Sequence, residues 1–192
     1  MKPEAAKIVQ LPSIEAAPRL LGCFLVRYLP EGRVKVKIVE TEAYHQDDQA
    51  SHSFRGITTR TAPMFEAGGR LYVYFTYGMH YCLNIVVGQK GLGEAVLIRA
   101  AEPVEGLEIM RQNRGLTDIK NLTNGPGKLA QALAVKDTGL SGKILNKSSI
   151  LLEPGEFVEG RDIKTAPRIG ISRATDLPWR FYIKDNPFVS KI

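Results

Sequence analysis

The sequence predicts an α+β fold: a single mixed domain with a mainly antiparallel β-sheet core, flanking helices and a protruding β-hairpin. Segments typical of strands outnumber those with helical spacing. These segments do not alternate with helices as βαβ units do, so a parallel sheet is not expected. No linker or shift of composition divides the chain, and we therefore expect residues 1–192 to form one domain.

The first half of the chain predicts a short helix followed by two strands. Ser13 is a candidate cap for a helix that ends before Gly22. An apolar run over residues 23–29 predicts the first strand, and valines that alternate with lysines over residues 33–41 predict the second. The polar segment 43–69 is too long for a simple connection, and long loops in compact domains are often functional.

The second half predicts a hairpin, two helices and further strands. The aromatic-rich stretch LYVYFTYGMHYCLN opens a hairpin over residues 71–87 with its turn at Tyr77-Gly78. A strand over residues 94–100 and a helix over residues 105–114 follow. Asn124 is a candidate cap for a helix over residues 125–135 that carries a proline in its first turn. The expected late strands cover residues 148–153, 166–172 and 179–184.

Charge favours an anionic partner without identifying one. The chain has 26 Lys and Arg against 20 Asp and Glu, for a net charge of +6 and a pI near 9.3. Such a balance suits nucleic acid, although many basic proteins bind none. No apolar run approaches the ~20 residues of a membrane helix, and the N-terminus lacks the apolar core of a signal peptide. We expect an intracellular protein that has no membrane partner.

The two cysteines predict buried thiols and no metal centre. Cys23 and Cys82 lie in strand-like runs and form neither a CxxC pair nor a spacing typical of metal ligands. The chain has three histidines. We therefore expect no metal ion and no structural zinc.

Tyr77, at the hairpin turn, is the first candidate for a functional residue. A tyrosine at a tight turn cannot bury both faces of its ring, and minor-groove binders insert such exposed side chains between bases. The alternative is that the ring folds back on its own hairpin.

A second cluster follows the strand over residues 33–41, where Glu42, Tyr44 and His52 are expected at the rim of the sheet. A base held between Tyr44, His52 and Tyr74 would be stacked on both faces, at ~1–3 kcal/mol per base. An alkylated, cationic base would gain a further cation–π interaction. The carboxylate could stabilise an oxocarbenium-like transition state and accept a proton from water. The alternative for Glu42 is a solvated residue at a strand end.

Seven motifs in order extend these observations to nearly the whole chain. They are VETEAY (39–44), HSFRGITTR (52–60) with Met64-Phe65, LYVYFTYGMHYCLN (71–84), VLIRAAEPVEG (96–106), GPGKLAQAL (125–133), PRIGI (167–171) and LPWRFYI (177–183). Together they closely resemble the alkyladenine DNA glycosylases, also called 3-methyladenine or methylpurine DNA glycosylases, over roughly residues 14–190.

The resemblance implies a monofunctional base-excision-repair enzyme. Such an enzyme flips alkylated or deaminated purines (3-methyladenine, 7-methylguanine, hypoxanthine, ethenoadenine) out of duplex DNA and hydrolyses the N-glycosidic bond, which leaves an abasic site. It is expected to act as a monomer, without cofactor or metal, and at the nucleoid if the source is bacterial. No lysine adjoins Glu42, so strand-cleaving Schiff-base chemistry is not expected.

Three family positions carry the chemistry. Glu42 matches the general base that activates water. Arg99 matches the arginine that helps to place this water and contacts the DNA backbone. The main-chain carbonyl of Ile169 matches a second acceptor for the water.

The remaining family positions form the base pocket and the wedge. The pocket is implied at Tyr44, His52 and Tyr74, with Asn84 crowding the exocyclic amine of guanine, and the residues at the unstacked step are Tyr77 and Met79.

The chain departs from the family pattern at Thr61, Asn124 and His80, none of which is a proposed catalytic group. Three other readings stay open from the residues alone. The chain could be a non-catalytic nucleic-acid-binding module that stacks bases on aromatic side chains. It could be an enzyme acting on free nucleosides or RNA, or a structural domain without activity.

Overall fold

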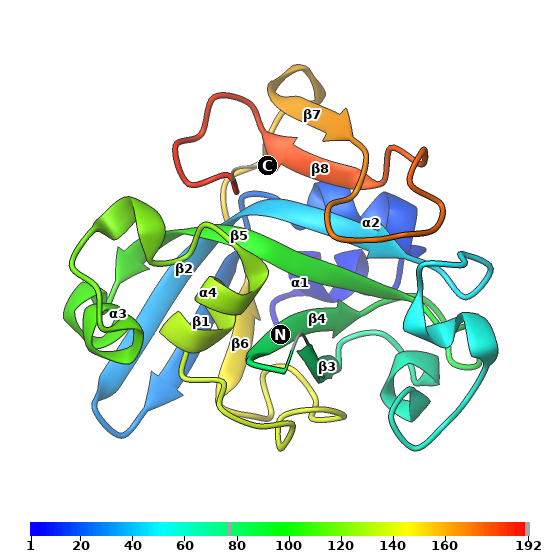
Figure 1. The fold of residues 1–192 in the computed structure, drawn as a ribbon, viewed down its shortest axis with the longest axis horizontal. Helices are drawn as coiled ribbons and strands as arrows, with labels where there is room; N and C mark the ends of the chain where they lie inside the picture. Colours follow the sequence, from blue (N-terminus) through cyan, green and yellow to red (C-terminus); the bar gives the residue numbers. More distant parts are fainter. Residues whose placement is uncertain (77, 191–192) are drawn as a thin grey trace.

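The computed structural model describes residues 1–76 and 78–190 and confirms the α+β class (Figure 1). Within these residues the strands are β1 (Phe24–Leu29), β2 (Gly32–Tyr44), β3 (Leu71–Thr76), β4 (His80–Val86), β5 (Ala95–Glu105), β6 (Ile150–Glu153), β7 (Ile163–Ala166) and β8 (Arg180–Ile183). The α-helices are α1 (Pro3–Ile8), α2 (Ser13–Arg19), α3 (Leu107–Arg114) and α4 (Pro126–Ala132). The short 3-10 helices are η1 (His52–Arg55), η2 (Ala62–Phe65), η3 (Ile119–Asn121) and η4 (Gly160–Asp162). Within the described part of the chain, no helix has the length and apolar character needed to cross a membrane.

The strands form one antiparallel sheet in the order β3-β4-β5-β2-β1-β6, and β8 joins it by pairing with both β2 and β7. Strand β2 pairs with β5 along most of its length. On its other edge, β2 pairs first with β1 and then, over residues 40–42, with β8. This middle stretch of β2 therefore has a strand on each side, which removes it from solvent.

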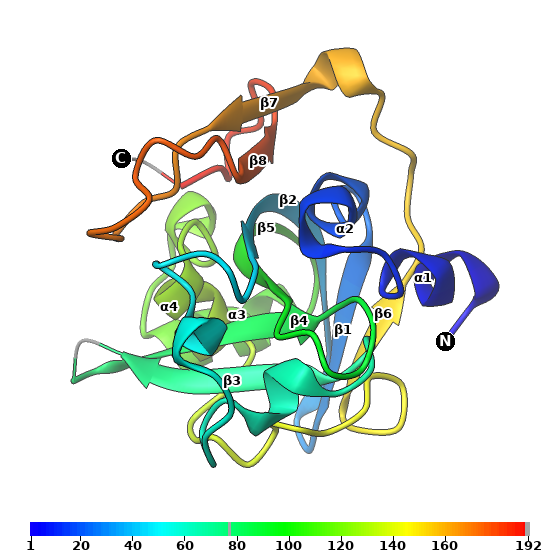
Figure 2. The same ribbon diagram turned by 90° about the vertical axis from the view of Figure 1, so that its right-hand side faces the viewer.

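The helices cover the two sides of the sheet. Figures 1 and 2 show α1 and α2 together on one side of β2 and β5, whereas α3 and α4 lie on the other. The hairpin of β3 and β4 extends away from the body of the sheet in Figure 2, with Thr76 paired to His80 near its end.

Strand alternation separates the core from the site. Successive side chains of a strand point to opposite faces. One face of β3, β4 and β5 carries Leu71, Val73, Leu83, Ile85, Val96 and Ile98, all of which belong to the main hydrophobic core. The other face carries Tyr72, Tyr74, Cys82, Asn84, Leu97 and Arg99, all of which line a cavity. The alternation of side chains along these strands thus places core residues on one face of the sheet and cavity-lining residues on the other.

Several predicted boundaries are wrong. The expected strand over residues 166–172 lies earlier, at β7, and ends where the chain turns into a segment that borders the cavity. The expected second strand continues past residue 41 to Tyr44, because β5 and β8 give it partners that its own sequence does not reveal. The helix expected over residues 105–114 begins at Leu107, since β5 occupies the residues before it.

Both predicted caps are also wrong. Ser13 is the first helical residue of α2, and its main-chain and side-chain groups both donate to the buried carboxylate of Glu94 at 2.9 Å. Asn124 precedes the actual cap of α4, Gly125, and its Oδ1 accepts a hydrogen bond from Lys128. Both polar side chains are therefore used in tertiary or side-chain contacts in place of a helix end. The predicted burial of the two free cysteines is confirmed.

Candidate active site

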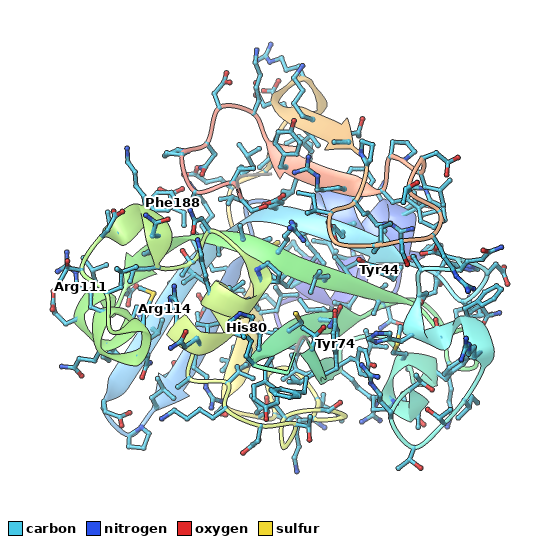
Figure 3. The ribbon with its side chains drawn as sticks, in the orientation of Figure 1. Tyr44, Tyr74, His80, Arg111, Arg114 and Phe188 are labelled. Atoms are coloured by element: carbon cyan, nitrogen blue, oxygen red, sulfur yellow. The ribbon has the colours of Figure 1, made fainter. Side chains whose placement is uncertain are left out.

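A cavity of about 630 Å³ lies over the face of the sheet opposite the main core. Its floor is made by Cys82 and Asn84 of β4 and by Leu97 and Arg99 of β5. Because the strand order is β3-β4-β5-β2, these two floor strands separate Tyr74 of β3 from Tyr44 of β2. With strands ~4.8 Å apart, the two backbones lie about 14 Å from one another. Both rings nevertheless line the same cavity, and Figure 3 labels the two residues.

Two irregular segments complete the walls. The chain between Gln49 and Met64 contributes one side, and Ile169 to Arg173 contributes the other. Within the first segment, Ser51 caps η1: its hydroxyl accepts a hydrogen bond from the amide of Ser53, which fixes the start of this short helix at His52. The long polar segment that the sequence singled out therefore borders the cavity.

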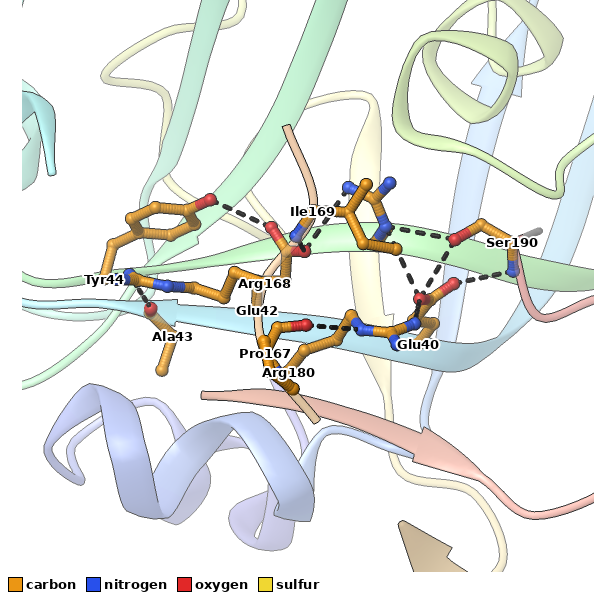
Figure 4. A network of polar contacts seen from close by, with 10 residues as sticks. Glu40, Glu42, Ala43, Tyr44, Pro167, Arg168, Ile169, Arg180 and Ser190 are labelled. Atoms are coloured by element: carbon orange, nitrogen blue, oxygen red, sulfur yellow. Dashed lines mark hydrogen bonds and ion pairs between the residues drawn. The ribbon is translucent and has the colours of Figure 1, made fainter. Parts of the chain in front are cut away.

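Glu42 lies behind the cavity wall and is fully buried. Its Oε2 accepts a hydrogen bond of 2.9 Å from the phenol of Tyr44, and its Oε1 accepts one of 2.9 Å from the amide of Ile169. The guanidinium of Arg99 lies 3.4 Å from the same Oε1. Tyr44, Ile169 and Arg99 all line the cavity, so the carboxylate contacts three of its lining residues (Figure 4). The alternative of a solvated glutamate at a strand end is wrong, because β8 and β5 enclose this residue.

Burial raises the pKa of Glu42 above its ordinary value. The charge of Arg99 and the hydrogen bonds from Ile169 and Tyr44 act against this rise by stabilising the ionised form. A carboxyl group whose pKa is raised toward neutrality is a stronger acceptor for the proton of water.

Arg99 lies between two buried carboxylates. Its Nη1 faces Glu42 at 3.4 Å, and its Nε faces Oε1 of Glu40 at 3.4 Å. The pairing of β2 with β5 shifts register on either side of Glu40, and such a bulge redirects side chains. Glu40 also accepts hydrogen bonds from Arg180 at 2.8 Å and from the amide of Ser190 at 2.8 Å (Figure 4). The position of Arg99 is thus set by a network that reaches the end of the described chain.

Three aromatic residues form one wall of the cavity. The His52 and Tyr74 rings meet edge to face with centroids 4.5 Å apart. Nδ1 of His52 lies 2.9 Å from the hydroxyl of the buried Tyr72. His52 keeps an exposed edge, but the packing of its ring and the nearby charge of Arg60 lower its pKa to about 4. His52 is therefore neutral at pH 7.

The opposite wall is formed by Tyr44, which is backed by a buried arginine. The guanidinium of Arg168 lies 4.6 Å from the centroid of the Tyr44 ring and 5.2 Å from that of Trp179. Its Nη1 donates to the carbonyl of Ala43 at 2.9 Å and pairs with Asp48. Tyr44 is thus held both by its hydroxyl and by one face of its ring.

Asn84 lies on the cavity floor and is 3 % exposed. Its Nδ2 donates to the carbonyl of Tyr72 at 3.0 Å, which holds the side-chain amide in one orientation.

Of the two proposed wedge residues, only Met79 belongs to the part of the chain that the structure describes. Tyr77 is outside the described residues, so its predicted role stays a prediction. Met79 follows it and is 70 % exposed, which agrees with a side chain available to a partner.

The departures from the family pattern each have a local structural role. The Oγ1 of Thr61 donates to the carbonyl of Gly56 at 3.0 Å and accepts from the amide of Thr58 at 2.8 Å, which closes the loop beside the cavity. His80 packs against Gly127 at the start of α4 (Figure 3), where a Cβ would approach its Cγ to 2.9 Å.

Seven of the residues singled out from the sequence lie at or directly behind this one cavity, and the roles expected for them stay predictions: Glu42, Tyr44, His52, Tyr74, Asn84, Arg99 and Ile169. The expected contact of the Ile169 carbonyl with the water stays a prediction, and the structure adds that the amide of Ile169 donates to Glu42. Sequence reasoning missed Glu40 and Arg168, although both lie inside quoted motifs, because strand alternation alone does not reveal a buried charge. Within the described part of the chain, no group of three His, Cys, Asp or Glu side chains could hold a metal ion.

Comparison with known proteins adds a family. The model of the methylpurine-DNA glycosylase family matches residues 7–187. A protein of Francisella tularensis is 50 % identical over 188 residues, which cover 96 % of each chain. One from Carboxydothermus hydrogenoformans is 51 % identical over 176 residues, 91 % of this chain and 92 % of its own. One from Chlorobaculum tepidum is 48 % identical over 193 residues, 100 % of this chain and 92 % of its own. Each is named "Putative 3-methyladenine DNA glycosylase".

Proposed function

The chain belongs to the methylpurine-DNA glycosylase family and is a DNA glycosylase, a hydrolase of N-glycosyl bonds, and from this we propose that it flips alkylated or deaminated purines out of duplex DNA and releases them. The proposed substrates are 3-methyladenine, 7-methylguanine, hypoxanthine and ethenoadenine. The observation that carries the proposal is the contact of one buried carboxylate, that of Glu42, with three groups that line the cavity.

In the proposed reaction Glu42 is the general base. It accepts a proton from a water that attacks the anomeric carbon of the flipped nucleotide, while the bond to the purine breaks and its electron pair leaves with the base. The transition state carries positive charge on the sugar, which the carboxylate stabilises. An alkylated purine leaves as a neutral base, whereas hypoxanthine needs a proton or strong contacts to its leaving nitrogen.

Arg99 and Ile169 are proposed to help Glu42 in placing this water. Each already holds Oε1 of the carboxylate, so each lies beside the atom that would accept the proton. Because donors occupy both carboxylate oxygens, we expect a bound water to displace one of them when substrate enters.

The base is proposed to stack between Tyr44 on one side and the His52–Tyr74 pair on the other. These walls lie across the floor strands, and aromatic stacking contributes ~1–3 kcal/mol per base. A neutral His52 avoids repulsion of a cationic purine. Asn84, fixed on the floor, is proposed to crowd the exocyclic amine of guanine.

Tyr77 and Met79 are proposed to fill the space that the flipped nucleotide leaves. The exposed Met79 at the end of the hairpin supports this role. We further propose that the enzyme works as a monomer, without metal, on the DNA of the bacterial nucleoid.

The deciding experiment is base release from a duplex with one hypoxanthine and from methylated duplex DNA that contains 3-methyladenine. Wild-type protein should leave an abasic site in an intact strand. Glu42→Gln keeps the shape of the side chain but cannot accept the proton, so it should bind the duplex and release base at least about 100-fold more slowly, the usual size of a general-base contribution.

Glu102→Gln is the matched control, because Glu102 is a partly exposed carboxylate that pairs with Lys37 and does not line the cavity. It should release base at the wild-type rate. Equal activity of the wild-type protein and Glu42→Gln would remove Glu42 from its role, and duplex binding without any release would favour a non-catalytic module.

A further inference from the structure

Arg168 is a buried cation directly behind a wall of the base pocket. Its side chain has no solvent exposure, and its guanidinium lies 4.6 Å from the centroid of the Tyr44 ring and 5.2 Å from that of Trp179. Among the described residues, Nε and Nη2 of this group have no hydrogen-bond partner. The group is held through Nη1 and by its stacking on the two rings.

Asp48 is the carboxylate that balances this charge. It is also fully buried and pairs with Nη1 of Arg168. No other carboxylate forms an ion pair with Arg168 within residues 1–76 and 78–190. Loss of the Asp48 charge would therefore leave a bare cation behind Tyr44.

The free face of Tyr44 is the one proposed to receive the purine. A base stacked there at about 3.5 Å would lie about 8 Å from the guanidinium carbon, since the ring centroid is 4.6 Å from it. At this separation, in the interior of a protein, two positive charges repel each other appreciably. A purine that is already cationic would feel this repulsion from the moment it binds, whereas a neutral purine would not feel it unless it takes up a proton as it leaves.

We infer that the Arg168–Asp48 pair is a specificity device for the reaction: Arg168 fixes the Tyr44 ring from behind, and Asp48 cancels its charge so that the pocket admits cationic alkylated purines. This inference rests on the proposed function, because it needs Tyr44 to stack on the substrate base. Neither residue lines the cavity: Arg168 positions Tyr44, and Asp48 balances the charge of Arg168.

The test compares single-turnover release of hypoxanthine, a neutral base, with that of 7-methylguanine, which is cationic in the nucleotide. Each variant is measured on both duplexes from one preparation, so a loss of folded protein cancels in the ratio. Asp48→Asn should lower the ratio of 7-methylguanine to hypoxanthine release by about tenfold. Asp48→Glu keeps the charge and should retain most of the ratio.

Arg168→Gln makes the opposite change of charge, because it removes the cation instead of the anion. It leaves Asp48 as an uncompensated anion, so the ratio should rise or stay, even though weaker support of Tyr44 slows release of both bases. A merely structural pair would change the ratio in the same direction, or not at all, in Asp48→Asn and Arg168→Gln, and that result would overturn the inference while leaving the proposed function intact. Wild-type protein that released hypoxanthine but no 7-methylguanine would also overturn it, and wild-type protein that released neither would overturn both.

Discussion

The phenol of Tyr44 donates a hydrogen bond of 2.9 Å to Oε2 of Glu42, two residues earlier on the same strand. Residues two apart on a strand share a face, so this contact follows from the extended backbone of β2. The ring proposed to stack on the base is therefore tied to the carboxylate proposed to activate water. If both roles hold, base binding is coupled to the protonation state of Glu42 through the hydroxyl oxygen of Tyr44.

Tyr44→Phe should separate these two roles. The ring stays available for stacking, but Glu42 loses a hydrogen bond that lowers its pKa. The pKa of Glu42 should then rise further, and the acidic limb of the profile of kcat/KM against pH should move to higher pH. On the alkaline plateau the rate should approach that of wild type, because Glu42 is ionised in both proteins.

Tyr72→Phe is the control for this profile, since the hydroxyl of Tyr72 contacts His52 and forms no hydrogen bond with Glu42. Its acidic limb should stay in place. An unmoved limb in Tyr44→Phe would show that the phenol does not influence the group that titrates.

Glu40 is expected to be a major determinant of stability. Its fully buried carboxylate faces Arg99 and Arg180 and accepts a hydrogen bond from the amide of Ser190. Glu40→Gln leaves both guanidiniums with less compensating charge, and removal of one partner from a buried ion pair typically costs about 3–5 kcal/mol. Urea unfolding of the variant should show a loss of this size in the free energy of unfolding.

Glu105→Gln provides the comparison, because its pairing with Arg33 is exposed on both sides. Exposed pairs contribute at most about 1 kcal/mol. Similar small losses in both variants would contradict a central structural role for Glu40.

The sequence could predict the site better than the ends of the elements. Residues 42, 44, 74 and 84 occupy alternate positions of strands whose period is evident in the sequence, so their common face follows from pairing alone. The end of β2 could not be predicted, because residues 40–42 pair with β8, about 140 positions later in the chain, and residues 43 and 44 pair with β5. Both partners reach β2 only in the folded protein.

The polar residues show the same limit. Serine is a residue type that favours helix caps, yet the hydroxyl of Ser13 donates a hydrogen bond to Glu94, 81 residues later in the chain. Arginines are mostly exposed in proteins, but two rings and Asp48 bury Arg168. Local preference identifies a group that needs a partner, and tertiary packing decides which partner it finds.

His52 should make the protein less stable in mild acid. Its pKa falls from the ordinary 6.5 to about 4 in the folded protein, so the unfolded chain binds the proton more readily. The contribution to stability is complete above about pH 6.5 and is lost as the pH falls toward 4. The midpoint of urea unfolding should therefore decline over this range.

His52→Gln isolates the effect, because the amide can still face the hydroxyl of Tyr72 but does not titrate. The decline between pH 6.5 and 4 should be smaller in this variant than in wild type. Parallel declines in the two proteins would assign the acid sensitivity to other groups.

Gly127 sets how closely α4 approaches the hairpin. A Cβ at this position would lie 2.9 Å from Cγ and 3.1 Å from Cβ of His80, which is closer than side-chain atoms normally pack. Replacement of a helical glycine by alanine usually stabilises by up to about 1 kcal/mol. Here Gly127→Ala should instead be neutral or destabilising, because His80 and the start of β4 must move.

In a His80→Ala background, Gly127→Ala should recover much of the stability that alanine normally adds to a helix, since the imidazole no longer obstructs the new methyl group. Urea unfolding of the four proteins gives the coupling between the two sites, which should be about 1 kcal/mol. Because β4 carries the end of the hairpin, Gly127→Ala should also slow base release from duplex DNA more than from single strands, on which no wedge is needed. Additive effects on stability, together with unchanged release from duplex DNA, would show that the packing of His80 on α4 does not position the hairpin.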